Sequence, residues 1–124
     1  MQYILIGLGG IVGALSRALI FQLFINHNLA HWATALVNIL GSFVIGGLFA
    51  MGSKLGWGSS GFYFLVAVGF MGSFTTFSAF SLDILKNLQS ADFLGACAHI
   101  SVNLFGSLVA VIIGYKSFQW LHLA

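Results

Sequence analysis

Long apolar stretches with almost no charge dominate this chain. Among 124 residues there are four lysines or arginines and two acidic residues, so charged residues make up 5% of the chain. Soluble domains carry about 25% charged residues, because water must solvate their surface. A soluble globular domain is therefore excluded, and lipid must be the solvent for most of this surface.

The apolar stretches predict four membrane-spanning helices. A span needs about 20 apolar residues, and the stretches cover about residues 3–25, 32–51, 62–88 and 93–115. They leave room only for short connections, so we expect residues 1–124 to form a single transmembrane domain of the all-α class. Four short helices are too few to enclose both a pore and its supporting shell, which predicts an oligomer.

The third stretch contains an interruption near its middle. Its first ten residues, 62–71, are apolar, but at about 1.5 Å per residue they cross only half of a hydrocarbon core of about 30 Å. A run of glycine, serine and threonine follows, and the helical pattern resumes by Phe80. We expect a helix broken at 72–76 near the membrane midplane. Such a break indicates a site, because exposed backbone is tolerated at that depth only where protein or a watery cavity covers it.

The few basic residues are balanced between the two sides of the predicted bundle. Lys54 and Lys116 fall on the side of the N-terminus, whereas Lys86 falls on the other side and Arg17 leans toward it. The positive-inside rule therefore has little to act on. Insertion in both orientations would permit an antiparallel homodimer; the alternative is that one decisive positive group fixes a single orientation.

Polar side chains recur at helical spacing in the second and fourth spans. Asn38 and Ser42 are four residues apart, as are His99, Asn103 and Ser107, so each set shares a helix face. A buried asparagine often joins two helices by hydrogen bonds, and for either span alone that interpretation stays open. Together with the hydroxyls of the third span, the two faces predict a line of hydrogen-bond donors through a dry bundle.

The chemistry of this line favours an anion. Phe77 and Phe80 are three residues apart and face one way, and the edge of an aromatic ring is the positive end of its quadrupole. Ring edges, amides and hydroxyls offer the weak, multiple sites that conduction requires; the alternative is that both rings are core packing. Asp83 is the only acid in a predicted span, and its spacing from Lys86 predicts a structural ion pair.

Three further features of the spans have structural or functional interpretations. A cation such as Arg17 costs about 2.5–3.5 kcal/mol at the centre of a span, so it either has a structural role or organises an anion vestibule. Gly9 and Gly13 form a small-xxx-small pair, which predicts close helix packing. The unwound backbone at 72–76 would expose carbonyl groups, which can coordinate Na⁺ in discontinuous helices.

Three motifs resemble the signatures of the CrcB/Fluc fluoride channel family, and together they extend over most of the chain. They are Gly10-x-x-Gly13-Ala14-x-x-Arg17, Asn38-x-x-Gly41-Ser42-Phe43-x-x-Gly46 and the segment 69–81. The Thr-Thr-Phe-Ser-x-Phe core of the third motif is the most specific piece. The sequence departs from the family pattern at Asp83, where glutamate is common, and at Asn103, where relatives carry histidine or tyrosine.

The resemblance implies a four-span inner-membrane protein that assembles as an antiparallel, dual-topology homodimer with two pores. Such a protein is a channel rather than an enzyme; it exports fluoride passively and protects the cell from fluoride toxicity. The residues that match the family's pore positions are Asn38, Thr76, Phe77, Ser78, Phe80, Asn103 and Ser107. Because His99 lies one turn before Asn103, the sequence leaves open which of the two faces the pore.

The resemblance also implies a structural Na⁺ at the dimer interface. The backbone carbonyls of Gly72 and Thr75 match its ligands, two from each subunit across the two-fold axis. Arg17 and Asp83 are expected to be structural.

Two other functions are compatible with four short spans. A small multidrug exporter exchanges protons for cations and needs a membrane-embedded acid, typically in the first span, where this chain has Arg17 and no acid. A non-transporting membrane assembly subunit would use the polar faces only to join helices. That function does not explain a hydroxyl-rich interruption near the midplane.

Overall fold

The computed structural model describes residues 1–26, 29–57 and 60–121, and every regular element in them is helical. Three helices are continuous: α1 (Gln2–Asn26), α2 (Ala30–Leu55) and α6 (Phe93–Leu121). The third span is assembled from α3 (Gly61–Tyr63), the π-helical segment η2 (Phe64–Met71), α4 (Gly72–Phe74) and α5 (Phe77–Gln89). The described residues thus contain four helical stretches long and apolar enough to cross a membrane, as the sequence predicted.

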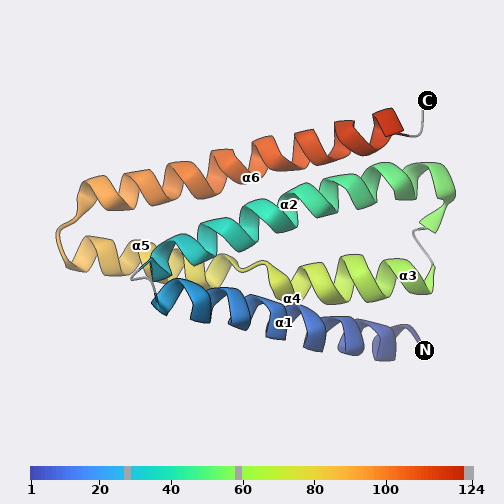
Figure 1. Ribbon diagram of the computed structural model, residues 1–124, viewed down its shortest axis with the longest axis horizontal. Coiled ribbons are helices and arrows are strands. Elements are labelled where there is room, and N and C mark those ends of the chain that lie inside the picture. The colour runs from blue at the N-terminus through green and yellow to red at the C-terminus, as the bar shows by residue number, and fades with distance from the viewer. Residues whose placement is uncertain (27–28, 58–59, 122–124) are drawn as a thin grey trace.

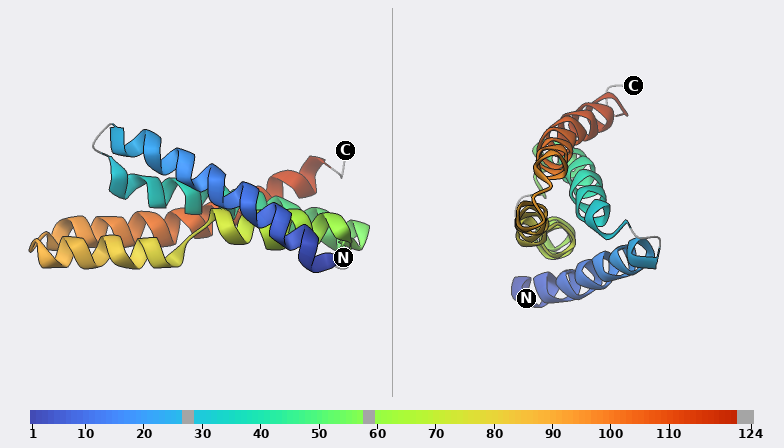
Figure 2. Two further views of the ribbon diagram at one scale, coloured as in Figure 1. Left: turned by 90° about the horizontal axis from the view of Figure 1, so that it is seen from below. Right: turned by 90° about the vertical axis from the view of Figure 1, so that its left-hand side faces the viewer.

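The four spans run back and forth along the long axis, so that both chain ends lie at the same end of the molecule (Figure 1). The helix α2 packs mainly against α6, and α1 packs mainly against η2. Seen along the long axis, the helices form an open curved arrangement, with α1 and α6 on opposite sides (Figure 2). In each span, at most 33% of the most apolar 18-residue stretch is buried within the chain. The remaining apolar surface must therefore be covered by lipid or by protein.

Glycines bring α1 against η2 at backbone distance. A Cβ atom on Gly9 would collide with the carbonyl oxygen of Leu65, and one on Gly13 would collide with the carbonyl oxygen of Phe70. The close packing predicted from this glycine pair is confirmed. Small residues serve this purpose in membranes because helices there associate through van der Waals contact of closely approaching backbones.

Glycines also bring α2 and α6 together at backbone distance. Gly46 of α2 lies against the carbonyl oxygen of Val111, and Gly114 of α6 lies against the carbonyl oxygen of Phe43. The two helices therefore approach closely toward the end of the molecule that holds the chain termini. The helix α6 also continues to Leu121, six residues beyond the predicted end of the fourth span at 115. The lysine at 116 ends the apolar run, but it does not stop a helix.

The break in the third span is shorter than the sequence predicted. Only Thr75 and Thr76 are extended, with φ, ψ of −80°, 158° and −153°, 119°. The prediction of a break over 72–76 was wrong for residues 72–74, which form α4. The reason is that Met71 O accepts the backbone N–H of Thr75 at 3.1 Å and its hydroxyl at 3.0 Å, which completes the last helical turn. The helix then restarts at Phe77, where the Thr76 hydroxyl accepts the N–H of Ala79 at 3.2 Å.

Candidate ion pathway at the helix break

An open cavity of about 540 Å³ lies beside the break, between α2, the third span and α6. It brings together six of the seven side chains that the sequence predicted for the pathway: Asn38, Thr76, Phe77, Phe80, Asn103 and Ser107. Ser42, on the same face of α2 as Asn38, lines it as well, as do Gly72 and Thr75. Ser78 is exposed outside the cavity lining, and its hydroxyl lies 3.2 Å from that of Thr76.

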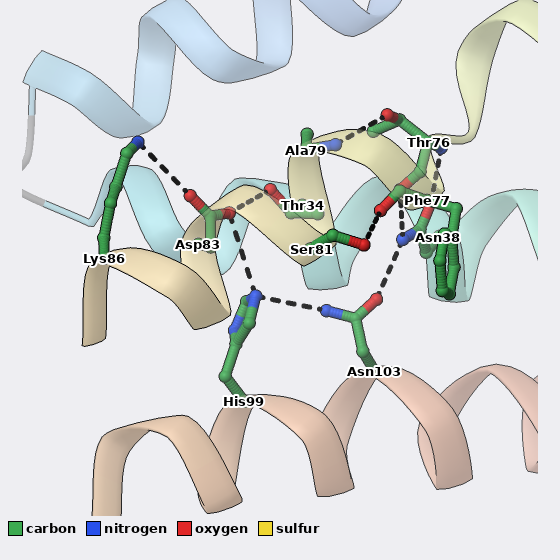
Figure 3. A network of polar contacts seen from close by, with 10 residues as sticks. All are labelled: Thr34, Asn38, Thr76, Phe77, Ala79, Ser81, Asp83, Lys86, His99 and Asn103. Atoms are coloured by element: carbon green, nitrogen blue, oxygen red, sulfur yellow. Dashed lines mark hydrogen bonds and ion pairs between the residues drawn. The ribbon is translucent and has the colours of Figure 1, made fainter. Parts of the chain in front are cut away.

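The side-chain amide of Asn38 holds the extended backbone at the break (Figure 3). Its Oδ1 accepts the N–H of Thr76 at 2.8 Å, and its Nδ2 donates to the carbonyl oxygen of Thr76 at 3.0 Å. The amide thus replaces a neighbouring strand, satisfying both backbone groups of a residue that has left the helix. Its second Nδ2 proton goes to Asn103 Oδ1 at 2.8 Å. Each unpaired backbone group in hydrocarbon costs several kcal/mol, which explains why a side chain replaces the missing backbone hydrogen bonds here.

Two carbonyl groups lose their usual helical donors at the break. In a continuous helix the N–H of Thr76 would bond to Gly72 O and that of Ala79 to Thr75 O. Here the N–H of Thr76 bonds to the side chain of Asn38, and the N–H of Ala79 bonds to the hydroxyl of Thr76. Arg17 Nη1 donates to Thr75 O at 3.4 Å. Arg17 therefore contacts the break itself, and both carbonyl oxygens have lost the donor that a continuous helix would supply.

The two predicted pathway rings differ in burial. Phe77 is 78% exposed, so within a single chain it is not core packing. Its ring centroid lies 5.5 Å from that of Phe80, with the ring planes at 58°. Phe80 is half-buried, and its ring centroid lies 5.7 Å from that of His99. An aromatic pair therefore lies at the start of α5, and both rings line the cavity.

A second polar cluster gathers around Asp83, one helical turn from the cavity. Lys86 forms the predicted ion pair with Asp83 at 3.6 Å. Sequence reasoning missed two other partners: the hydroxyl of Thr34 donates to Asp83 Oδ2 at 2.7 Å, and His99 Nε2 lies 3.8 Å from the same oxygen. The spacing did contain a signal for both partners. Thr34 lies four residues before Asn38 and His99 lies four residues before Asn103, so each shares a helix face with a predicted pathway residue.

The structure places Asn103, and not His99, at the cavity. Asn103 is 5% exposed and lines the cavity together with Ser107, one turn further along α6. His99 is 1% exposed and lies beyond the lining, with its Nε2 3.5 Å from Asn103 Nδ2. The open question about the fourth span therefore has a geometric answer in this chain: Asn103 lines the cavity, and His99 lies behind the lining, next to Asn103 and Phe80.

Comparison with known proteins places the chain in a family. The family model described as CrcB-like protein, Camphor Resistance (CrcB), matches residues 4–115. A Campylobacter lari protein named "Fluoride-specific ion channel FluC" is 39% identical over 92% of this chain and 94% of its own length. A Shewanella oneidensis protein of the same name is 38% identical over 91% of this chain and 92% of its own. The extent of these matches shows that the chain belongs to the CrcB family.

Proposed function

We propose that this protein is a fluoride-specific channel, a multi-pass protein of the inner membrane through which fluoride leaves the cell passively. The observation that carries the proposal is the set of neutral polar and aromatic groups around the cavity at the break: two amides, hydroxyl-bearing side chains and a pair of aromatic rings. The relatives named as fluoride-specific channels support it. No energy source is required, because a passive pore only has to lower the barrier for an ion that already has a gradient.

The lining chemistry favours a small hard anion over a cation. Amide N–H groups, hydroxyls and ring edges all present partial positive charge, but none carries a full charge that would trap the ion. The one acid in the described spans, Asp83, is engaged with Lys86 and Thr34 and is outside the cavity lining. That engagement is unsuited to the proton exchange of a multidrug exporter. Hydrogen fluoride enters cells as a neutral acid and ionises in the less acidic cytoplasm, so passive release of the anion lowers its toxicity.

We infer that the functional unit is an antiparallel homodimer. The cavity is open, Phe77 is 78% exposed, and Ser78 and Ser81 are exposed beside it. In a bilayer this polar surface and the extended backbone need a cover other than lipid. A second copy supplies such a cover, and the balance of Arg17 and Lys86 against Lys54 and Lys116 permits it to insert in the opposite orientation. Lipid would then surround the outer apolar faces of the helices.

A structural Na⁺ at the dimer interface belongs to the same proposal. The carbonyl oxygens of Gly72 and Thr75 are hard ligands that have lost their helical donors, which is the chemistry that a hard cation selects. Arg17 approaches Thr75 O at 3.4 Å, but a carbonyl oxygen has two lone pairs and can accept a second partner. When bound, the ion would neutralise the carbonyl dipoles of two breaks that meet at a two-fold axis.

The test is efflux of fluoride and of chloride from liposomes that contain the purified protein, with protein-free liposomes as the control. We expect fluoride to be released and chloride release to stay at the background rate. Absence of fluoride efflux from vesicles shown to contain folded protein would exclude the channel.

The same assay examines the pathway residues. Asn38→Asp keeps an oxygen for Thr76 N–H but loses both amide protons and adds a negative charge, and Phe80→Ile removes a ring edge. We expect each to lower fluoride flux by roughly tenfold or more, which is about the effect of losing one contact with the ion. The dimer should remain intact in gel filtration. Ser53→Ala, whose hydroxyl bonds only within α2 to Ala50 O at 2.9 Å, is the matched control. Unchanged flux in both pathway variants would mean that the ion travels elsewhere.

A further inference from the structure

A continuous chain of polar groups leads from the break, past the cavity, to the charged cluster on α5 (Figure 3). Asn38 bonds to both backbone groups of Thr76 and donates to Asn103 Oδ1 at 2.8 Å. On the other side of the same amide, Asn103 Nδ2 lies 3.5 Å from His99 Nε2. His99 Nε2 in turn lies 3.8 Å from Asp83 Oδ2. Thr76 at the break and four residues on three helices thus form one row.

The direction of the hydrogen bonds in this row is set by the backbone at the break. A backbone N–H can only donate and a carbonyl can only accept, so Thr76 determines which way the amide of Asn38 faces. The second proton of Asn38 Nδ2 then points at Asn103, which must present its oxygen. The NH₂ group of Asn103 consequently faces His99, whose Nε2 accepts. Each orientation is determined by the one before it.

This arrangement leaves Asn38 without a proton for an anion in the cavity. Both protons of its Nδ2 are committed, one to Thr76 O and one to Asn103 Oδ1. Asn103 likewise turns its oxygen toward Asn38 and its protons away from it. If the amide of Asn103 made a half-turn, its oxygen would face His99 and its NH₂ group would join that of Asn38 beside the cavity. Two N–H donors would then converge where the structure now has a donor and an acceptor.

The half-turn requires a partner at position 99 that can both accept and donate. A neutral imidazole has this property, because its proton can reside on either ring nitrogen. The ring of His99 is held in place by Trp32 and Phe80, with centroids 6.0 and 5.7 Å away. With the proton on Nε2, the ring would donate to the oxygen of the turned Asn103 amide. Asp83 Oδ2, which already accepts from Thr34, lies 3.8 Å from the same ring nitrogen.

We propose that His99 is a positioning residue that allows the amide of Asn103 to turn over, so that Asn103 joins Asn38 as a second N–H donor to a small anion in the cavity. The inference rests on the proposed function and adds a residue and a conformational step to it. Both amides line the cavity, so an anion beside the pair receives one N–H from each. His99 is 1% exposed and outside the cavity lining, with its Nε2 3.5 Å from Asn103 Nδ2.

The direct test uses the wild-type protein in bilayers, with nitrogen-labelled asparagine and fluoride, observed by solid-state NMR that detects fluorine–nitrogen proximity. We expect the side-chain nitrogens of both Asn38 and Asn103 to contact fluoride. Asn87, in the last turns of α5 and outside the cavity lining, provides an internal control and should show no contact. Contact with Asn38 alone, or with neither amide, would overturn the proposal, and the experiment does not depend on any variant folding.

A second test measures fluoride efflux from two variants at position 99. His99→Phe keeps an aromatic ring between Trp32 and Phe80 but can neither accept nor donate, whereas His99→Gln keeps both abilities. We expect His99→Phe to lower the flux roughly tenfold, the effect of one hydrogen bond, and His99→Gln to stay much closer to the wild type. A purely structural histidine would predict the opposite order, since phenylalanine is the better match for the ring's shape.

These outcomes separate the inference from the function on which it rests. Wild-type vesicles that release no fluoride would contradict the proposed function itself. Wild-type vesicles that conduct, combined with equal flux in His99→Phe and in the wild type, would contradict only the roles of His99 and of the Asn103 half-turn.

Discussion

The two halves of the third span are held to the rest of the molecule by different kinds of contact. Before the break, η2 lies against α1 through glycines whose backbones approach carbonyl oxygens directly. After the break, α5 is connected to α2 by the hydrogen bond from Thr34 to Asp83, and His99 of α6 lies 3.8 Å from the same carboxylate oxygen. One half is packed by shape, and the other is joined by polar groups.

This difference shows how a very small membrane protein can combine rigidity with a polar pathway. Close backbone packing needs no polar group and tolerates no added atom, so it suits the half that only supports the break. Hydrogen bonds can exchange partners, so they suit the half that lies along the proposed pathway. The break separates the two halves and is itself held by Asn38.

The largest effect is expected from Asn38→Leu, on the polar side of the break. Leucine removes the partners of both Thr76 backbone groups, and each buried group left unsatisfied costs about 1–3 kcal/mol. We expect a loss of roughly 2–6 kcal/mol of stability for the two groups together, seen as failure to recover a folded protein from detergent or as a much lower thermal midpoint. Asn38→Gln, which keeps the amide on a longer stem, is the informative comparison. Wild-type stability in Asn38→Leu would mean that the break is held by something else.

A somewhat smaller loss is expected from Gly13→Ala, on the packed side. The added methyl group collides with the carbonyl oxygen of Phe70, and such overpacking costs about 1–3 kcal/mol because backbone must shift. Gly7→Ala is the matched control, since a Cβ on Gly7 meets nothing within 4 Å in the same helix. Thermal denaturation in detergent should separate the two variants. Equal midpoints would show that the α1–η2 contact is looser than the glycine positions indicate.

The smallest effect is expected from Thr34→Val, a change of nearly equal volume in the charged cluster. It removes the 2.7 Å hydrogen bond to Asp83, while Lys86 at 3.6 Å still faces the carboxylate. Hydrogen bonds to charged groups contribute about 1.5–3 kcal/mol, and the remaining partner should keep the loss near the lower value. Thermal denaturation measures it, and a loss as large as that of Asn38→Leu would mean that the two polar clusters do not differ in importance.

Much of the fold and part of the site could be predicted from local patterns. The four spans are predicted by apolar length, the glycine contacts of α1 by the spacing of Gly9 and Gly13, and the shared faces of the pathway residues by intervals of four. The width of the break could not be predicted, because it depends on Met71 O accepting two bonds from Thr75. The partners of Asp83 were missed because a single charged neighbour, Lys86, already accounted for it within one helix.

Composition and spacing along single helices determine the solvent of this chain, the number of its spans and the neutral, donor-rich character of its polar groups. These properties belong to individual segments, so they can be read before any packing is known. The pairing of Asn38 with the backbone of Thr76, the contact of Arg17 with Thr75 and the place of Asn103 ahead of His99 at the cavity are of another kind. They join residues far apart in the chain, so they depend on how the helices pack against one another, which no single segment specifies.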